Sequence, residues 1–80
     1  MINKFLVIKF QKEYKEDVLV DLITVILKNL YRNGYSFYLD DVLISKNRYD
    51  FIFGGNIKNY KILINNISDY IKINGYHLRA

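Results

Sequence analysis

The 80-residue sequence contains no cysteine, no proline and no tryptophan, and it has one histidine. Without cysteine, neither a disulfide nor a thiolate zinc site can hold the chain together, so its stability has to come from packing. The longest apolar run, residues 18–27, contains Asp21 and Thr24 and falls short of the roughly 18 apolar residues that a membrane span needs. The start of the chain lacks the pattern of a signal peptide. We therefore expect a cytoplasmic protein with no membrane partner.

Apolar residues are abundant by contrast. They make up 51% of the chain and include eight Tyr and five Phe, which is generous for one small core. A disordered chain would be poorer in these residues. The net charge of +4 is ordinary for the surface of a small domain, although it would also suit a nucleic-acid partner. We expect a single folded domain over residues 1–80.

Two segments carry apolar residues at the three- and four-residue spacing of a helix face. The first covers residues 17–31, and the second follows Asn56, a favourable N-cap residue. An Asn-Gly-Tyr tripeptide follows each segment, so Gly34 and Gly75 are expected to close helices of roughly 15 to 18 residues. The helix-face positions are Val18, Leu19, Leu22, Ile23, Ile26, Leu27 and Leu30, then Ile57, Tyr60, Leu63, Ile64, Ile67, Tyr70 and Ile71.

Four segments are suited to strands, namely residues 4–10, 35–39, 49–53 and 76–80. The unit strand–helix–strand thus occurs twice, as a pseudo-repeat of residues 3–39 and 48–80. Two such units joined by a hairpin give the ferredoxin-like βαββαβ fold. This is a two-layer α+β sandwich with both helices on one face of an antiparallel sheet. In that topology the first and third strands are central, and here they are the most apolar.

The alternation of the second strand loses phase at Asp40-Asp41. This indicates either a longer strand with a bulge at that point or a separate short strand over residues 42–45. We favour the bulged strand.

Few side chains suit catalysis. The one histidine, His77, has no obvious partner for acid–base chemistry. Asp40 and Asp41, together with Asp50, could be considered as ligands of a divalent cation, but adjacent carboxylates on an extended strand point to opposite faces. The turn-like pair Gly54-Gly55 matches neither common phosphate-loop pattern.

Acylphosphatases resemble this topology but carry an arginine-bearing, glycine-rich loop after the first strand, where this chain has QKEYKED. We therefore expect no enzyme activity, no metal and no cofactor.

One face of a two-layer sheet stays free of helices and is available for binding. RNA-recognition motifs place aromatic rings there, and Tyr49, Phe51 and Phe53 are similar to that pattern. Turning these three rings into the core instead buries more apolar surface, at roughly 1.5–3 kcal/mol per side chain. We favour the inward orientation, which leaves Asp50 and Ile52 on the open face.

The first strand is apolar on both sides, so its orientation stays open. Two sets of side chains could face outward: Phe5, Val7 and Lys9, or Leu6, Ile8 and Phe10. In the first case Lys9 could pair with Asp50 across the strands. An apolar patch rimmed by charge and tyrosine is typical of a protein-binding or homodimer surface. The candidate partner-binding residues are Phe5, Val7, Lys9, Tyr38, Asp50, Ile52, Tyr76 and Arg79, with Tyr14 as a further rim residue.

We expect a small non-enzymatic protein that binds another macromolecule, with a protein as the first choice. In size and AT-biased composition the chain resembles the small inhibitors that phages and mobile elements encode against host machinery, including anti-CRISPR proteins. That resemblance implies action in the host cytoplasm. The alternatives are an RNA- or single-stranded-DNA-binding domain that uses the open sheet face, and a homodimeric assembly domain.

Overall fold

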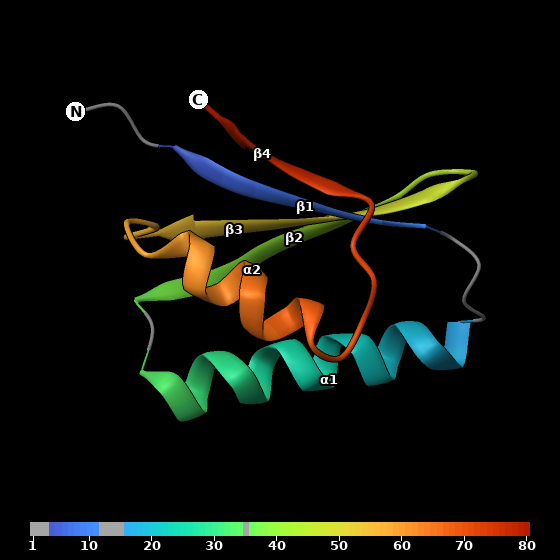
Figure 1. Ribbon diagram of the computed structural model, residues 1–80. Helices are drawn as coiled ribbons and strands as arrows, with labels where there is room; N and C mark the ends of the chain where they lie inside the picture. The colour runs from blue at the N-terminus through green and yellow to red at the C-terminus, as the bar shows by residue number, and fades with distance from the viewer. Residues whose placement is uncertain (1–3, 12–15, 35) are drawn as a thin grey trace.

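The computed structural model describes residues 4–11, 16–34 and 36–80, with residues 16–18 described by their backbone. Six elements follow one another within these described residues, and Figure 1 shows them in two layers, a sheet above and two helices below. Neither helix in this part of the chain is long and apolar enough to cross a membrane. The elements are β1 (Phe5–Gln11), α1 (Glu16–Asn33), β2 (Phe37–Ile44), β3 (Arg48–Gly55), α2 (Tyr60–Ser68) and β4 (Gly75–Arg79).

The strands are arranged in the order β2-β3-β1-β4, and each neighbouring pair is antiparallel. Both helices cover the same face of this sheet (Figure 1). The predicted ferredoxin-like sandwich is thereby confirmed, with β1 and β3 at its centre. The two central strands are the most apolar because each has a neighbour on both sides and helices beneath it.

The core lies between the central strands and the helices. Tyr49, Phe51 and Phe53 point into it and are each at most 1% exposed, which confirms the inward orientation of the three rings. Phe51 packs edge-to-face against Phe10 of β1, with ring centroids 5.1 Å apart. The other buried members are Leu6 and Ile8 from β1, Phe37 from β2, and Leu22, Ile26, Leu30, Leu63, Ile64 and Ile67 from the helices.

β2 is one continuous strand with a bulge. Its register with β3 shifts between Leu39 and Asp41, as predicted, and there is no separate strand over residues 42–45. The Asp41 carboxylate accepts a hydrogen bond from the backbone N–H of Val42 at 2.8 Å. Val42 then lies opposite Phe51 on the helix side of the sheet. The extra residue therefore restores the apolar phase that the sequence loses at this point.

The two Asn-Gly-Tyr tripeptides have different structural roles. Gly34 follows the last residue of α1 with a φ of 62°, the left-handed conformation predicted for a helix end. The same prediction for Gly75 was wrong, because α2 ends at Ser68 and Gly75 is the first residue of β4. The N–H of Asn74 already donates to the Lys9 carbonyl at 2.7 Å.

α2 is shorter than predicted at both ends. It begins at Tyr60 after an Asn59 N-cap, not after Asn56. It ends early because the chain beyond it has to cross the roughly 10 Å between packed layers before it can pair with β1. Because α2 ends early, Tyr70 lies beyond the helix and is 68% exposed, outside the core where it was predicted. Leu27 of α1 was also predicted on the helix face that packs on the core, but it is 47% exposed.

Candidate functional site

The open face is the side of the sheet that faces away from the helices. Strand register places its side chains in rows that run across the strands, so each row mixes residues distant in sequence. The residues of the open face are Phe5, Val7, Lys9 and Gln11 of β1, Tyr38, Asp41 and Leu43 of β2, Arg48, Asp50, Ile52 and Gly54 of β3, and Gly75, His77 and Arg79 of β4.

The middle row is apolar at its centre. Ile52 pairs with Val7 across β3 and β1, and Asp41 and His77 occupy the two ends of the row. Ile52 and Val7 are each only 3% exposed, although no described element covers this side of the sheet. Neither belongs to the core cluster on the helix side. They form a second, small apolar cluster, which their taller neighbours on the open face shield from water.

A row of aromatic and cationic groups lies beside this cluster. The Tyr38 ring lies over Gly54, where a Cβ atom would come within 2.8 Å of the tyrosine oxygen. At the other edge, the Arg79 guanidinium lies 5.9 Å from the centroid of the Phe5 ring, a cation–π distance. Both contacts lay long side chains along the sheet, and the Tyr38 ring still remains 53% exposed.

The third row contains the ionic contacts of the face. Asp50 is bound by Arg48 of its own strand, with Nε 2.7 Å from Oδ1 and Nη2 3.1 Å from Oδ2. Lys9 stands opposite Asp50 in the register, as predicted, yet among the described residues it forms no ion pair. Asp50 pairs with Arg48 rather than with Lys9 because the planar guanidinium, two residues away on the same face, reaches both carboxylate oxygens at once. The Lys9 ammonium therefore remains available to a partner.

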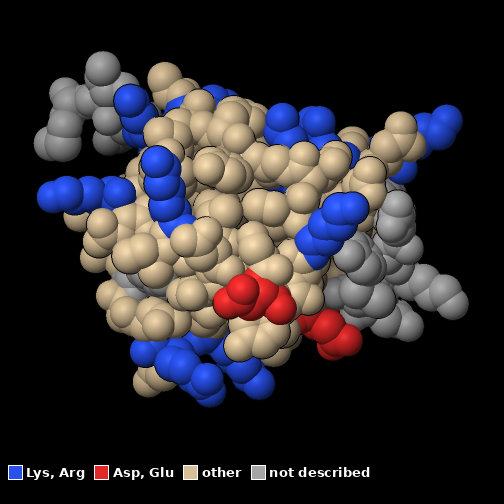
Figure 2. Space-filling model, in the orientation of Figure 1, with Lys and Arg blue, Asp and Glu red and all other residues tan. Residues whose placement is uncertain are grey.

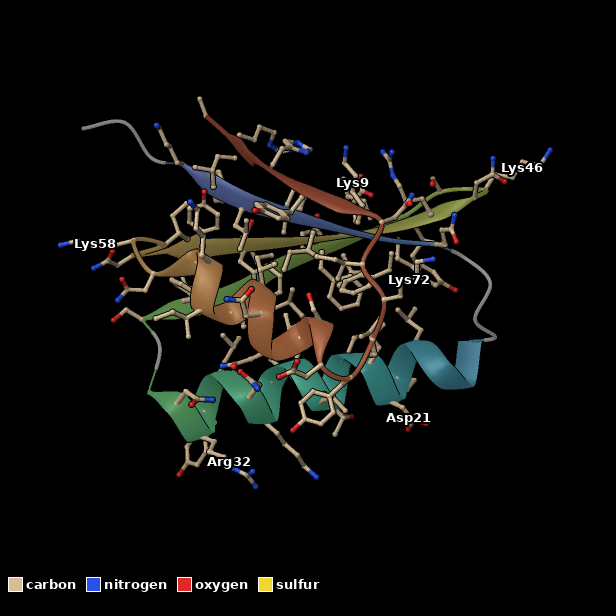
Figure 3. The ribbon with its side chains drawn as sticks, in the orientation of Figure 1. Lys9, Asp21, Arg32, Lys46, Lys58 and Lys72 are labelled. Atoms are coloured by element: carbon tan, nitrogen blue, oxygen red, sulfur yellow. The ribbon has the colours of Figure 1, made fainter. Side chains whose placement is uncertain are left out.

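The charge of the open face changes from one edge to the other. Because Arg48 neutralises Asp50, the remaining formal charges are Lys9 and Arg79 on β1 and β4, and Asp41 on the β2 edge. Figure 3 shows Lys9 projecting upward, away from the helices. In Figure 2, basic side chains follow the upper edge of the molecule, where this face is seen in profile. The β1–β4 half of the face is thus cationic.

All of the predicted partner-binding residues except Tyr76 lie on the open face. Tyr76 pairs with Ile8 and so points to the helix side, where its ring packs edge-to-face against Tyr60 of α2 at 6.0 Å. Tyr14 lies outside the described residues. The placement of the others follows from the first of the two orientations considered for β1, with Phe5, Val7 and Lys9 facing outward.

Several members of the face were not among the predicted partner-binding residues: Gln11, Asp41, Leu43, Arg48, Gly54, Gly75 and His77. Leu43 points outward only because the bulge shifts the phase of β2. Gly54 is a residue of β3 rather than part of a turn, and its role depends on the register that brings Tyr38 over it. The sequence held one signal for Leu43: after Asp40-Asp41 the apolar side of β2 passes to Val42 and Ile44, which leaves Leu43 on the opposite side.

The described residues hold no group of three or more His, Asp or Glu side chains placed to bind a metal ion. Asp41 and His77 occupy opposite ends of the middle row, on the two edge strands of the sheet. The face therefore offers apolar contact, a cation–π pair and free cationic groups.

No family model matches the chain, and no curated protein matches it in sequence. Among solved structures, it is similar to an aspartate kinase from Clostridium acetobutylicum, which is described as an important allosteric enzyme. The TM-score is 0.64 at 14% sequence identity, and the match covers 96% of this chain but only 18% of the kinase chain. A similarity at this level of identity shows a shared fold. The protein is accordingly a ferredoxin-like α+β domain with an open, partly cationic sheet face.

Proposed function

We propose that the protein acts by binding another protein through the open face of its sheet, without catalysing a reaction. The supporting observation is the combination of exposed apolar side chains with an unpaired cation on one face. Tyr38 is 53% exposed and Leu43 is 45% exposed, and Lys9 lies in the same row as Leu43. Exposed tyrosine and aliphatic side chains next to charged groups are typical of protein interfaces.

The composition of β3 favours a protein partner over a nucleic acid. Sheets that bind RNA present stacking rings from their central strands. Here the open-face side of β3 carries Asp50 and Ile52, while its three rings are buried in the core. The carboxylate of Asp41 on the edge strand would also repel a phosphate backbone.

The charge pattern indicates the chemistry of the partner. A complementary surface would place apolar side chains against Leu43 and Tyr38 and carboxylates against Lys9 and Arg79. Binding of this kind would suit an inhibitor that blocks a host protein, the role that the chain's size and composition resemble.

Point variants of the open face test the proposal. We expect Leu43→Asp and Lys9→Glu to abolish capture of the partner by the tagged protein, because Leu43 is exposed and Lys9 is partly exposed with no ion pair among the described residues. The matched controls are Ile62→Asp, an α2 residue that is 51% exposed, and Lys61→Glu, which is also exposed on α2. These controls should retain the partner. Ile52 is unsuitable for this test because it is buried.

Nuclease treatment separates the two kinds of macromolecule. A protein that stays bound after nuclease treatment, and is lost with Leu43→Asp but not with Ile62→Asp, supports the proposal. Material that disappears with nuclease would point to the nucleic-acid alternative. Equal loss with the open-face variants and the α2 controls would overturn the open face as the binding surface.

A further inference from the structure

The outward side of α1 carries an apolar stripe that no described element covers. The stripe consists of Val20, Thr24, Leu27 and Tyr31, with successive spacings of four, three and four residues. At 100° per residue these positions lie within an arc of about 60°. Val20 is 64% exposed, Leu27 47% and Tyr31 92%. The Thr24 hydroxyl donates to the Val20 carbonyl at 2.9 Å, so this polar group is satisfied within the helix. We call these residues the outer stripe.

The spacing of the outer stripe is that of the contact seam between two packed helices. A stripe of this kind is more apolar than a surface helix needs, and Tyr31 is almost fully exposed. A shallow groove lined by Leu27, Lys28, Tyr31 and Arg32 lies along its C-terminal half. The seam therefore offers both protruding side chains and a depression that could receive them.

Charges of opposite sign flank the outer stripe at its two ends. Asp21 lies beside the N-terminal half, and Lys28 and Arg32 lie beside the C-terminal half. All three fall on the same flank, about 90° round the helix from the centre of the stripe. Asp21 and Lys28 are too far apart to pair within one helix, at roughly 10 Å of axial rise. Figure 3 shows Asp21 and Arg32 on the underside of α1, towards opposite ends of the helix.

We propose that a second copy of this chain covers the outer stripe, with the two α1 helices packed antiparallel about a two-fold axis. In that arrangement Val20 of one copy lies level with Tyr31 of the other, and Thr24 lies level with Leu27. Asp21 then comes level with the stretch between Lys28 and Arg32 of the second copy. In an antiparallel pair each flank of one helix faces the same flank of the other helix. Asp21 of each copy therefore faces Lys28 and Arg32 of the other copy, once on each side of the two-fold axis.

The charge pattern favours this antiparallel pair over a parallel one. A parallel pair packs each flank against the opposite flank of its partner, so the two Asp21 side chains would lie on opposite sides of the contact and could not face Lys28 or Arg32 of the other copy. An antiparallel pair is self-complementary, as an isologous two-fold interface has to be. Its contact is limited to a few helical turns, at the low end of the roughly 1,200–2,000 Å² that stable interfaces bury. The dimer should therefore form reversibly as concentration rises.

This inference goes beyond the proposed function and does not depend on it. The α1 helix and the open face of the sheet lie on opposite sides of the fold (Figure 1), so a dimer formed through α1 leaves both open faces accessible. A dimer would present two such faces and gain avidity for a partner with repeated sites.

Sedimentation equilibrium with charge-swapped variants tests the arrangement. The wild type should shift from the 9.6 kDa monomer toward twice that mass as concentration increases. Asp21→Lys alone, and the double variant Lys28→Asp with Arg32→Asp, should each remain monomeric because like charges then face each other. An equimolar mixture of these two variants should regain the doubled mass, because every facing pair is again of opposite sign.

Matched controls exclude a folding effect. Lys61→Asp with Lys72→Asp makes the same change of charge at exposed positions away from the outer stripe and should dimerise like the wild type. Far-UV circular dichroism verifies that each variant is folded. A wild type that stays at 9.6 kDa at millimolar concentration would overturn the proposal, as would a mixture that fails to regain the doubled mass. A dimer that is lost with Leu43→Asp and survives Asp21→Lys would place the interface on the sheet instead.

Discussion

The ring of Tyr38 on β2 lies over Gly54 on β3, and a Cβ atom at position 54 would come within 2.8 Å of Oη and 2.9 Å of Cζ. Glycine within a strand often marks a position that another group approaches closely. Here the missing side chain lets the tyrosine lie along the open face instead of standing out from the edge strand. Gly54 therefore helps to shape the proposed binding surface although it has no side chain of its own.

The Tyr38–Gly54 contact predicts an energetic coupling. Gly54→Ala should destabilise the protein by about 1 kcal/mol, since the ring has to leave its position over the backbone. In a Tyr38→Ala background the same substitution should be neutral or stabilising by about 0.5–1 kcal/mol, the usual advantage of Ala over Gly in a strand. Urea denaturation of the four proteins in this double-mutant cycle measures the difference. Additive effects would show that the ring does not lie over Gly54.

The neighbouring glycine should respond differently. Gly55 has a φ of 90°, and a Cβ atom there would meet the Ser36 carbonyl oxygen. Backbone cannot move aside as a tyrosine ring can, so Gly55→Ala should cost at least about 1–3 kcal/mol. Gly34→Ala is the control, because Gly34 has a φ of 62° with no atom within 4 Å and should show the backbone cost alone. The urea midpoint of Gly55→Ala should therefore be lower than that of Gly34→Ala, and the reverse order would contradict this prediction.

The small apolar cluster on the open face should contribute to stability as a core does. Ile52→Ala should cost roughly 2–4 kcal/mol, because Ile52 is 3% exposed and its removal leaves a cavity beside Val7. Leu43→Ala, at a residue of the same face that is 45% exposed, should cost well under half as much. Chemical denaturation of both variants checks the comparison. Equal, small losses would mean that Ile52 is accessible to water.

The ion pair on β3 should matter little for stability. The Arg48 side chain is 44% exposed and that of Asp50 is 17% exposed, and such pairs are worth about 0–1 kcal/mol. Arg48→Ala should lower the free energy of unfolding by less than about 1 kcal/mol, partly because Lys9 stands opposite Asp50 and can replace the lost partner. The double variant with Lys9→Ala should show a larger than additive loss in the same urea experiment. If the losses of the two single variants simply add up in the double variant, Lys9 does not replace Arg48 as the partner of Asp50.

Disulfide trapping tests the register of the proposed helix pair. The chain has no cysteine, so single cysteines can be introduced without a background. A mixture of Thr24→Cys and Leu27→Cys should give a cross-linked heterodimer faster than either variant gives a homodimer, because the antiparallel register places these two positions at the same level. Lys61→Cys serves as an exposed control. Preferential linkage of Thr24→Cys to itself would indicate a parallel pair.

Several features of the fold could be predicted from local pattern. Tyr49, Phe51 and Phe53 alternate with Asp50 and Ile52, and one orientation buries far more apolar surface than the other. The loss of phase at Asp40-Asp41 marked the bulge for a similar reason, since the apolar side of β2 has to return to the core. For β3 the apolar residues leave a single favourable solution, whereas for β2 they left a bulge and a separate short strand as alternatives, and the register with β3 shows the bulge.

The candidate site could be predicted only in part. The apolar alternatives of β1 are nearly equal in sequence, so pairing with β3 and the helices beneath had to decide that Phe5, Val7 and Lys9 face outward. Likewise, the carboxylate of Asp50 had two cations within reach, and the geometry of the fold selected Arg48.

By itself the sequence determined the order of strands and helices, the loss of phase in β2 and the inward face of β3, because hydrophobic periodicity acts within each segment. Only the tertiary structure decided where α2 ends, that Tyr76 packs against Tyr60, and that the Tyr38 ring lies over Gly54. These features depend on the spacing between the layers and on the register between strands. Both are set by contacts between residues that are distant in the chain, which no local pattern encodes.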